Sequence, residues 1–122
     1  MYTVSRFEFT TVAPERADVT VDESIQSKGQ LLKVCAEGLG FPDYFGENWD
    51  AFIDCLSDLG WSRAAEAIID HGGVPRLPAR ELRLYLECLI DAADRRAPAR
   101  APRLRIVFRV KDRGAIVAAL GR

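Results

Sequence analysis

Helix-like and strand-like segments alternate along this chain, and that order limits the folds it can adopt more than any single residue does. Apolar residues spaced three and four apart mark three helices, and a short fourth helix is expected at residues 115–120. Strand-like runs occur at residues 4–11, 67–69 and 104–110. Helices between successive strands allow parallel strands joined by right-handed crossovers. The sequence therefore predicts an α/β fold with a small three-stranded parallel sheet and helices packed on it.

Residues that suit helix ends predict where the three longer helices begin. Ser27 and Gln30 have capping-box spacing, so the first helix should begin there. Asn48 suits the N-cap of a second helix, which should run to about Leu59. The third helix should begin near Pro78, because proline is well tolerated in the first turn of a helix.

Size and composition fit a single domain over residues 1–122, since 48% of the residues are hydrophobic and can form one core. No apolar run approaches the roughly 18 residues that span a bilayer, and the N-terminus lacks the zones of a signal peptide. We therefore expect a cytoplasmic protein with no membrane partner. Cys35, Cys55 and Cys88 form no CxxC pair and lie among apolar residues, so we expect buried, reduced thiols.

Charge is unevenly distributed behind a net charge of −1. Residues 41–60 carry only acidic charges, which are Asp43, Glu47, Asp50, Asp54 and Asp58. If this segment forms a helix, Asp50, Asp54 and Asp58 share one side of it, and the apolar residues centre on the opposite side. Like charges four positions apart cost a helix about 0.2–0.5 kcal/mol per pair, and no basic residue within the segment offsets this. The pattern fits a cationic partner and a merely solvated acidic face equally well.

The segment of residues 41–56 reads Phe-Pro-Asp-Tyr-Phe-Gly-Glu-Asn-Trp-Asp-Ala-Phe-Ile-Asp-Cys-Leu. It resembles the signature of the barstar family, which has proline, an aromatic pair, glycine, an acid, asparagine, any residue, aspartate and alanine, and then a second aspartate four positions after the first. The order of strands and helices is also similar to that family's fold. The resemblance implies an inhibitor, not an enzyme, that blocks a barnase-like ribonuclease by placing an acidic helix and the preceding loop in its substrate cleft.

The resemblance also implies which residues contact the ribonuclease. Tyr44, Asp50 and Asp54 correspond to contact positions of the family, with Asp54 as the central one. The carboxylates of the two aspartates would stand in for RNA phosphates and pair with arginine through charge-assisted hydrogen bonds. Asp58 would contribute mainly by steering the partner. Asp91, on the third helix, is the nearest candidate for a further acidic contact.

Gly46 and Asn48 complete the candidate surface, chiefly as loop and cap residues. Ile53 stands where the best-known member of the family has a tryptophan. The partner could therefore be a different ribonuclease, such as a toxin domain, and this chain could be its immunity protein.

Catalysis is the first alternative to inhibition. Asp50 and Asp54 would lie on a convex helix face without the pocket that a substrate needs. His71, the only histidine, fits a loop or edge residue better than a catalytic base. The sequence has no phosphate-binding glycine loop, no nucleophile elbow and no zinc-spaced cluster. We therefore expect no catalytic residue, no metal and no cofactor.

Nucleic-acid binding by the C-terminal region is the second alternative. From Arg95 onward basic residues dominate, and Asp112 is the single acid. Arginines can bind phosphates, but in this region only Phe108 offers an aromatic ring for base stacking. The sequence therefore favours a basic ribonuclease over nucleic acid as the partner.

Overall fold

In the computed structural model, which describes residues 2–43, 45–96 and 100–121, four parallel strands form one sheet. The strands are β1 (Glu8–Thr10), β2 (Val19–Val21), β3 (Glu66–His71) and β4 (Arg103–Arg109), in the spatial order β1-β4-β3-β2. The helices are α1 (Lys28–Leu39), α2 (Trp49–Asp58), α3 (Ala79–Arg95) and α4 (Arg113–Leu120), with 3₁₀ turns η1 (Val4–Arg6) and η2 (Val110–Asp112).

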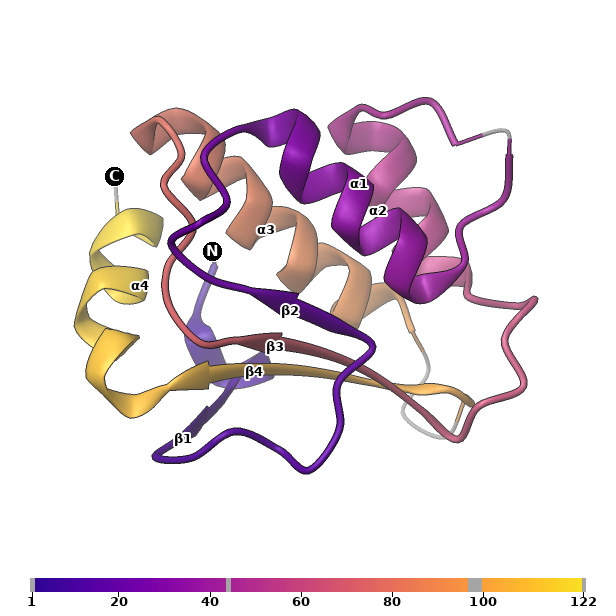
Figure 1. The fold of residues 1–122 in the computed structure, drawn as a ribbon, viewed down its shortest axis with the longest axis horizontal. Coiled ribbons are helices and arrows are strands. Elements are labelled where there is room, and N and C mark those ends of the chain that lie inside the picture. Colours follow the sequence, from indigo (N-terminus) through magenta and orange to yellow (C-terminus); the bar gives the residue numbers. More distant parts are fainter. Residues whose placement is uncertain (1, 44, 97–99, 122) are drawn as a thin grey trace.

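Helices α1, α2 and α3 cover one face of the sheet, and α4 lies at one end of the molecule beside α3 (Figure 1). The connection from β1 to β2, residues 11–18, contains no helix and passes from one edge strand of the sheet to the other. The predicted α/β class, with a parallel sheet covered by helices, is confirmed.

The predicted number of strands was wrong, because β2 was taken for loop. Val19 and Val21 are buried and Thr20 between them is exposed, so the strand does show the period of two. Its three residues are too short for that pattern to stand out from the acidic residues on either side. Pairing with β3, in which Val19 lies opposite Ile69, stabilises β2 as an edge strand.

The first predicted strand also begins later than expected, since Val4–Arg6 form the turn η1 and β1 starts at Glu8. Two contacts hold the N-terminal segment along α3 instead of along β4. The Tyr2 hydroxyl donates to Asp91 Oδ2 at 3.0 Å, and Arg6 Nε donates to Asp94 Oδ1 at 2.7 Å.

The predicted starts of α1, α2 and α3 are confirmed. Ser27 Oγ accepts the amide of Gln30 at 3.1 Å, and the Gln30 side chain accepts the amide of Gln26 rather than that of Ser27. Asn48 Oδ1 accepts the amide of Ala51 at 2.8 Å. Pro78 takes the N-cap position of α3, one residue before its first turn.

His71 is neither a loop residue nor an edge residue, which corrects the sequence prediction. It ends β3, one of the two inner strands of the sheet, and the side chain is fully buried. Its Nδ1 lies 2.9 Å from the Val107 carbonyl oxygen, its Nε2 lies 2.7 Å from the Tyr85 hydroxyl, and its ring stacks on Phe108 at 3.9 Å. Because both ring nitrogens have partners, the ring can be buried, and burial lowers its pKa to about 4.

The three cysteines are buried free thiols, as predicted. They lie on α1, α2 and α3, and burial raises the pKa of Cys35 to about 12. Among the residues that the structure describes, no helix is long and apolar enough to cross a membrane.

Candidate protein-binding face

Helix α2 is held against α3 by its apolar side, which turns the opposite side to solvent. Phe52, Cys55 and Leu56 are buried. At the start of α2, the Trp49 indole donates to Glu81 Oε2 on α3 at 2.8 Å. Burial of this stripe and the Trp49 hydrogen bond define the orientation of the helix.

The loop before α2 is anchored to the core by aromatic residues. The Phe41 amide donates to the Ala36 carbonyl at 2.9 Å. The centroid of the Phe41 ring lies 5.1 Å from that of Phe45 and 6.1 Å from that of Trp61. The Trp61 indole donates to the Leu39 carbonyl at 3.0 Å, which connects the segment after α2 to the end of α1. The loop thus packs on the same core as the helix.

Gly46 and Asn48 shape the turn into α2. The Asn48 side-chain amide donates to the Gly46 carbonyl at 3.3 Å, and a Cβ on Gly46 would lie only 3.1 Å from that nitrogen. Glu47, between them, has a φ of 54°, in the left-handed region. Both residues therefore have a structural role, whatever a partner does with them. Tyr44 lies outside the described residues.

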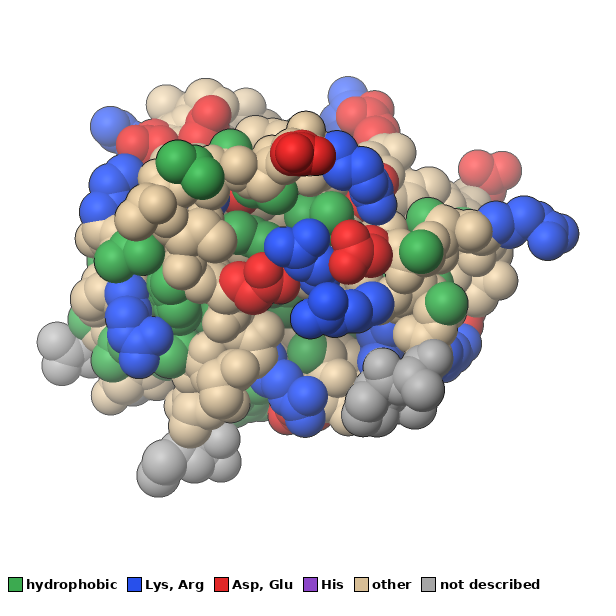
Figure 2. All heavy atoms as spheres, turned by 90° about the horizontal axis from the view of Figure 1, so that it is seen from below, with side chains coloured by type: hydrophobic (Ala, Val, Ile, Leu, Met, Phe, Trp, Pro, Cys, Tyr) green, Lys and Arg blue, Asp and Glu red, His purple; other side chains and the backbone are tan. Residues whose placement is uncertain are grey.

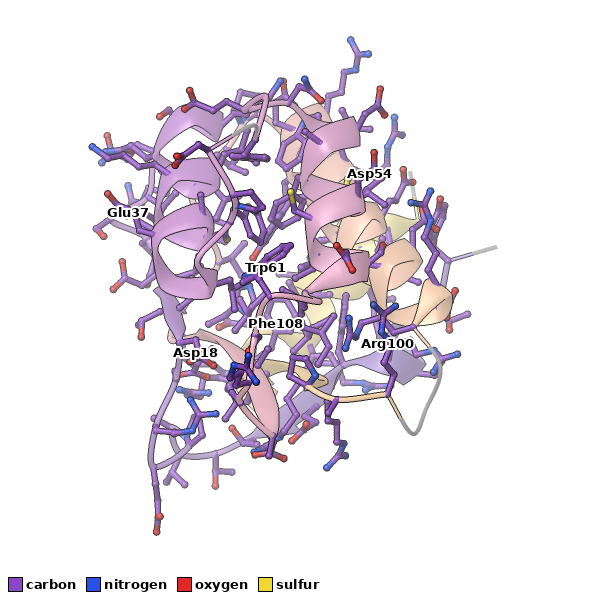
Figure 3. The ribbon with its side chains drawn as sticks, turned by 90° about the vertical axis from the view of Figure 1, so that its right-hand side faces the viewer. Asp18, Glu37, Asp54, Trp61, Arg100 and Phe108 are labelled. Carbon is purple, nitrogen blue, oxygen red and sulfur yellow. The ribbon has the colours of Figure 1, made fainter. Side chains whose placement is uncertain are left out.

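The three aspartates of α2 lie on its exposed side. Asp54 points away from the helical layer (Figure 3), and its side chain is 77% exposed, compared with 52% for Asp58. Asp50, in the first turn, is exposed and forms no ion pair with any other described residue. We call Asp50, Asp54 and Asp58 the acidic face.

Two arginines from beyond α2 partly neutralise the acidic face, a feature that the sequence analysis missed. Arg95 Nη1 lies 3.3 Å from Asp54 Oδ1, and Arg100 Nη2 lies 3.1 Å from Asp58 Oδ1. These arginines are 41 and 42 positions from their partners in the sequence. The basic tract was visible in the sequence, but no local pattern showed that it would return to α2.

Arg96, the residue directly after α3, holds the C-terminal end of α2 and is buried. Its guanidinium donates to the carbonyls of Ser57, Asp58 and Pro102 at 2.9, 2.8 and 2.5 Å. A cation on the last carbonyls of a helix satisfies acceptors that lack intrahelical partners. Asn48 and Arg96 therefore secure opposite ends of the helix that carries the acidic face.

Asp91 lies on α3, and the partner of its carboxylate is the N-terminal Tyr2 rather than a residue of α2. That hydrogen bond, with burial as a second cause, raises the pKa of Tyr2 to about 12. Asp91 is half-buried beside Tyr2, so a partner protein would meet the two side chains together.

The arginines of β4 are paired with acids on neighbouring strands. Arg105 forms two hydrogen bonds of 2.9 Å with Glu8, and Arg109 forms two of 2.9 and 2.7 Å with Asp70. Figure 2 shows basic and acidic side chains side by side on the sheet face opposite the helices. The positive charge of β4 is thus largely compensated within the sheet. Across the described ranges, no group of three His, Cys, Asp or Glu side chains gathers as a metal site would require.

A model of the barstar (barnase inhibitor) family matches residues 17–110 of this chain. The matched span contains the loop before α2, the acidic face, α3, and three of the four strands that the structure describes. No curated protein and no solved structure shows a significant match to the chain.

Proposed function

The chain belongs to the barstar (barnase inhibitor) family, and from that premise we propose that it inhibits a barnase-type ribonuclease by placing the acidic face of α2 in the enzyme's active site. The observation that carries the proposal is the exposure of Asp50, Asp54 and Asp58 on one side of a helix that is held at both ends. A ribonuclease cleft binds phosphodiesters with cations, and carboxylates pair with the same cations.

Rigidity of α2 supports this role. The N-cap of Asn48, the hydrogen bond from Trp49 to Glu81, and the three bonds from Arg96 hold the helix in place before any partner arrives. A preorganised surface loses less conformational entropy on binding, so more of the interaction energy appears as affinity.

The ion pairs that Asp54 and Asp58 already form do not oppose the proposal. Both pairs are exposed, and such pairs contribute about 0–1 kcal/mol. An arginine of the partner that loses its water in the interface gains more by pairing with the same carboxylate. Arg95 and Arg100 can therefore give way to it at little cost.

Further parts of the proposal rest on the family. Tyr44, Gly46 and Asn48 would lie at the rim of the contact on the loop side, and Asp91 at the rim on the side of α3. The chain would act as an inhibitor in the cytoplasm, without a catalytic residue of its own. Serving as the immunity protein of a toxin ribonuclease is a narrower form of the same role.

The decisive experiment is a titration of the protein into a barnase-type ribonuclease while RNA cleavage is followed. We expect stoichiometric inhibition by the unmodified protein. Asp54→Ala should weaken it by about 100-fold or more, because removal of one partner of a buried ion pair costs about 3–5 kcal/mol. Glu37→Ala is the matched control, since it removes one exposed carboxylate from α1, on the other side of the helical layer (Figure 3).

If Asp54→Ala and Glu37→Ala reduced inhibition to the same extent, the result would contradict a role for the acidic face. No inhibition by the folded, unmodified protein would contradict the proposed partner.

A further inference from the structure

A polar pocket of about 310 Å³ lies where β4 begins, outside the acidic face. Strand β1 pairs with β4 only from Val107 onward, so the first residues of β4 have no β1 residue opposite them. The pocket occupies that side of β4, between the segment before β1 and the C-terminal end of α3. Arg100, labelled in Figure 3, lies in the segment that follows α3 and lines the pocket.

Positive charge dominates the lining of this pocket. Four arginines line it, which are Arg6, Arg96, Arg100 and Arg103. Glu8 is the one acid of the lining, and both of its oxygens already accept hydrogen bonds from Arg105. Burial, followed by the nearby charge of Arg100, lowers the pKa of Arg96. A guanidinium nevertheless stays charged in proteins, so the pocket gathers cations that repel one another.

Three of these arginines keep donors available for a ligand. Each of the three forms an ion pair with a carboxylate that does not line the pocket. Arg6 pairs with Asp94 at 2.7 Å, Arg100 with Asp58 at 3.1 Å, and Arg103 with Glu66 at 3.7 Å. The side chains of Arg6, Arg100 and Arg103 are 49%, 45% and 69% exposed. Each guanidinium has five N–H donors, and one carboxylate does not use them all. Arg96 adds a charge held in place by three carbonyls.

We propose that this arginine pocket binds a small phosphate dianion, either inorganic phosphate or a phosphate monoester. The planar fork of arginine matches phosphate oxygens in pairs, and the volume is at the lower end of the range for ligand sites. Phe7, the aromatic residue of the lining, is only 7% exposed, so a nucleotide base has no ring there to stack on. The site therefore recognises the phosphate group itself. The site shares Arg100 with the ion pair of Asp58, but the proposal does not rest on the proposed inhibition of a ribonuclease.

The test is a titration of the ¹⁵N-labelled protein with sodium phosphate at neutral pH and constant ionic strength, following the arginine Nε–H signals by NMR. Saturable shifts at the four pocket arginines, absent when sodium chloride replaces phosphate, are the expected result. Methyl phosphate, titrated in parallel, distinguishes the two sources. If methyl phosphate saturates the shifts at concentrations similar to those of inorganic phosphate, the pocket binds monoesters. If only inorganic phosphate binds, the free ion is the ligand.

The double variant Arg6→Gln with Arg103→Gln removes two pocket cations that each form only an exposed ion pair. It should bind phosphate at least about tenfold more weakly, since hydrogen bonds to charged groups contribute strongly. The double variant Arg76→Gln with Arg80→Gln, whose two exposed arginines lie near the start of α3 and outside the pocket, is the charge-matched control and should bind normally. Arg96 is left unchanged because it holds α2. The proposal would be overturned if the arginine Nε–H shifts rose linearly with phosphate concentration without saturating. It would also be overturned if they saturated at the same concentration in the double variant of Arg6 and Arg103 as in the unmodified protein.

Discussion

At the scale of single residues, His71 shows how a titratable side chain can serve as part of an apolar core. Its ring lies between β3 and α3 and contacts Phe108 and Tyr85. Burial favours the neutral form and is the largest cause of its lowered pKa, while the hydrogen bond to Val107 and the nearby Asp70 act in the opposite direction. The charged form would therefore oppose folding.

The stability of the protein should fall in mild acid because of this residue. The pKa of His71 is about 4 in the folded protein and 6.5 in an ordinary environment. Between these values the unfolded chain binds more protons, so the free energy of unfolding decreases as pH falls below 6.5 and is unaffected by this group above it. The loss should reach about 3 kcal/mol by pH 4. Urea unfolding at intervals from pH 7.5 to 4 measures the free energy of unfolding over this range.

His71→Gln is the control for this prediction. Glutamine can keep a hydrogen bond but does not titrate, so this variant should be less stable at pH 7.5 and show a shallower dependence on pH between 6.5 and 5. If the two proteins lost stability in parallel over that range, His71 would not be the group responsible.

At the scale of elements, α2 depends on contacts at both of its ends. Asn48 caps its start, and Arg96 reaches its end from beyond α3 and also contacts the carbonyl of Pro102 just before β4. A single guanidinium thus connects a helix, the end of the next helix and a strand. Arg96 therefore contributes to the position of the acidic face together with the residues of α2 itself.

Replacing Arg96 should be far more costly than replacing its neighbour. Arg96→Met leaves three carbonyls without their donor, and we expect a loss of about 2 kcal/mol or more in the free energy of unfolding. Arg95→Met removes only an exposed pair with Asp54 and should cost less than about 1 kcal/mol. Urea unfolding of the two variants gives both numbers. Similar losses would mean that Arg96 does not secure α2.

At the scale of the whole molecule, the acidic face and the sheet face differ in how far their charges are compensated. The acidic face carries three carboxylates, and its two arginine partners are themselves exposed. On the sheet face, acids and arginines alternate and compensate one another (Figure 2). Asp50 is therefore the aspartate of the acidic face that forms no ion pair with another described residue.

This charge distribution should steer a basic ribonuclease onto α2. The association rate constant should fall steeply as sodium chloride rises from low to physiological concentration, because salt screens exposed charges. Arg95→Gln should raise the rate at low salt by a few-fold, since it removes a positive charge beside Asp54. Stopped-flow fluorescence measures both effects. A rate independent of salt, or one that Arg95→Gln lowers, would exclude steering by this face.

Much of the fold and of the candidate site could be predicted from the sequence because the signals are local. Ser27 and Asn48 cap helices through amides three residues away, and the aspartates of α2 share a side because they recur every fourth residue. Both features follow from the geometry of one helix, whatever surrounds it.

Other features were decided only by the tertiary structure. Val19–Val21 became a strand because β3 lay beside it, and His71 became a core residue because Tyr85 and Val107 supplied its partners. Arg95, Arg96 and Arg100 reach α2 from about 40 positions away. Period and capping are properties of neighbouring residues, whereas these contacts exist only after packing has brought distant segments together, so no local pattern encodes them.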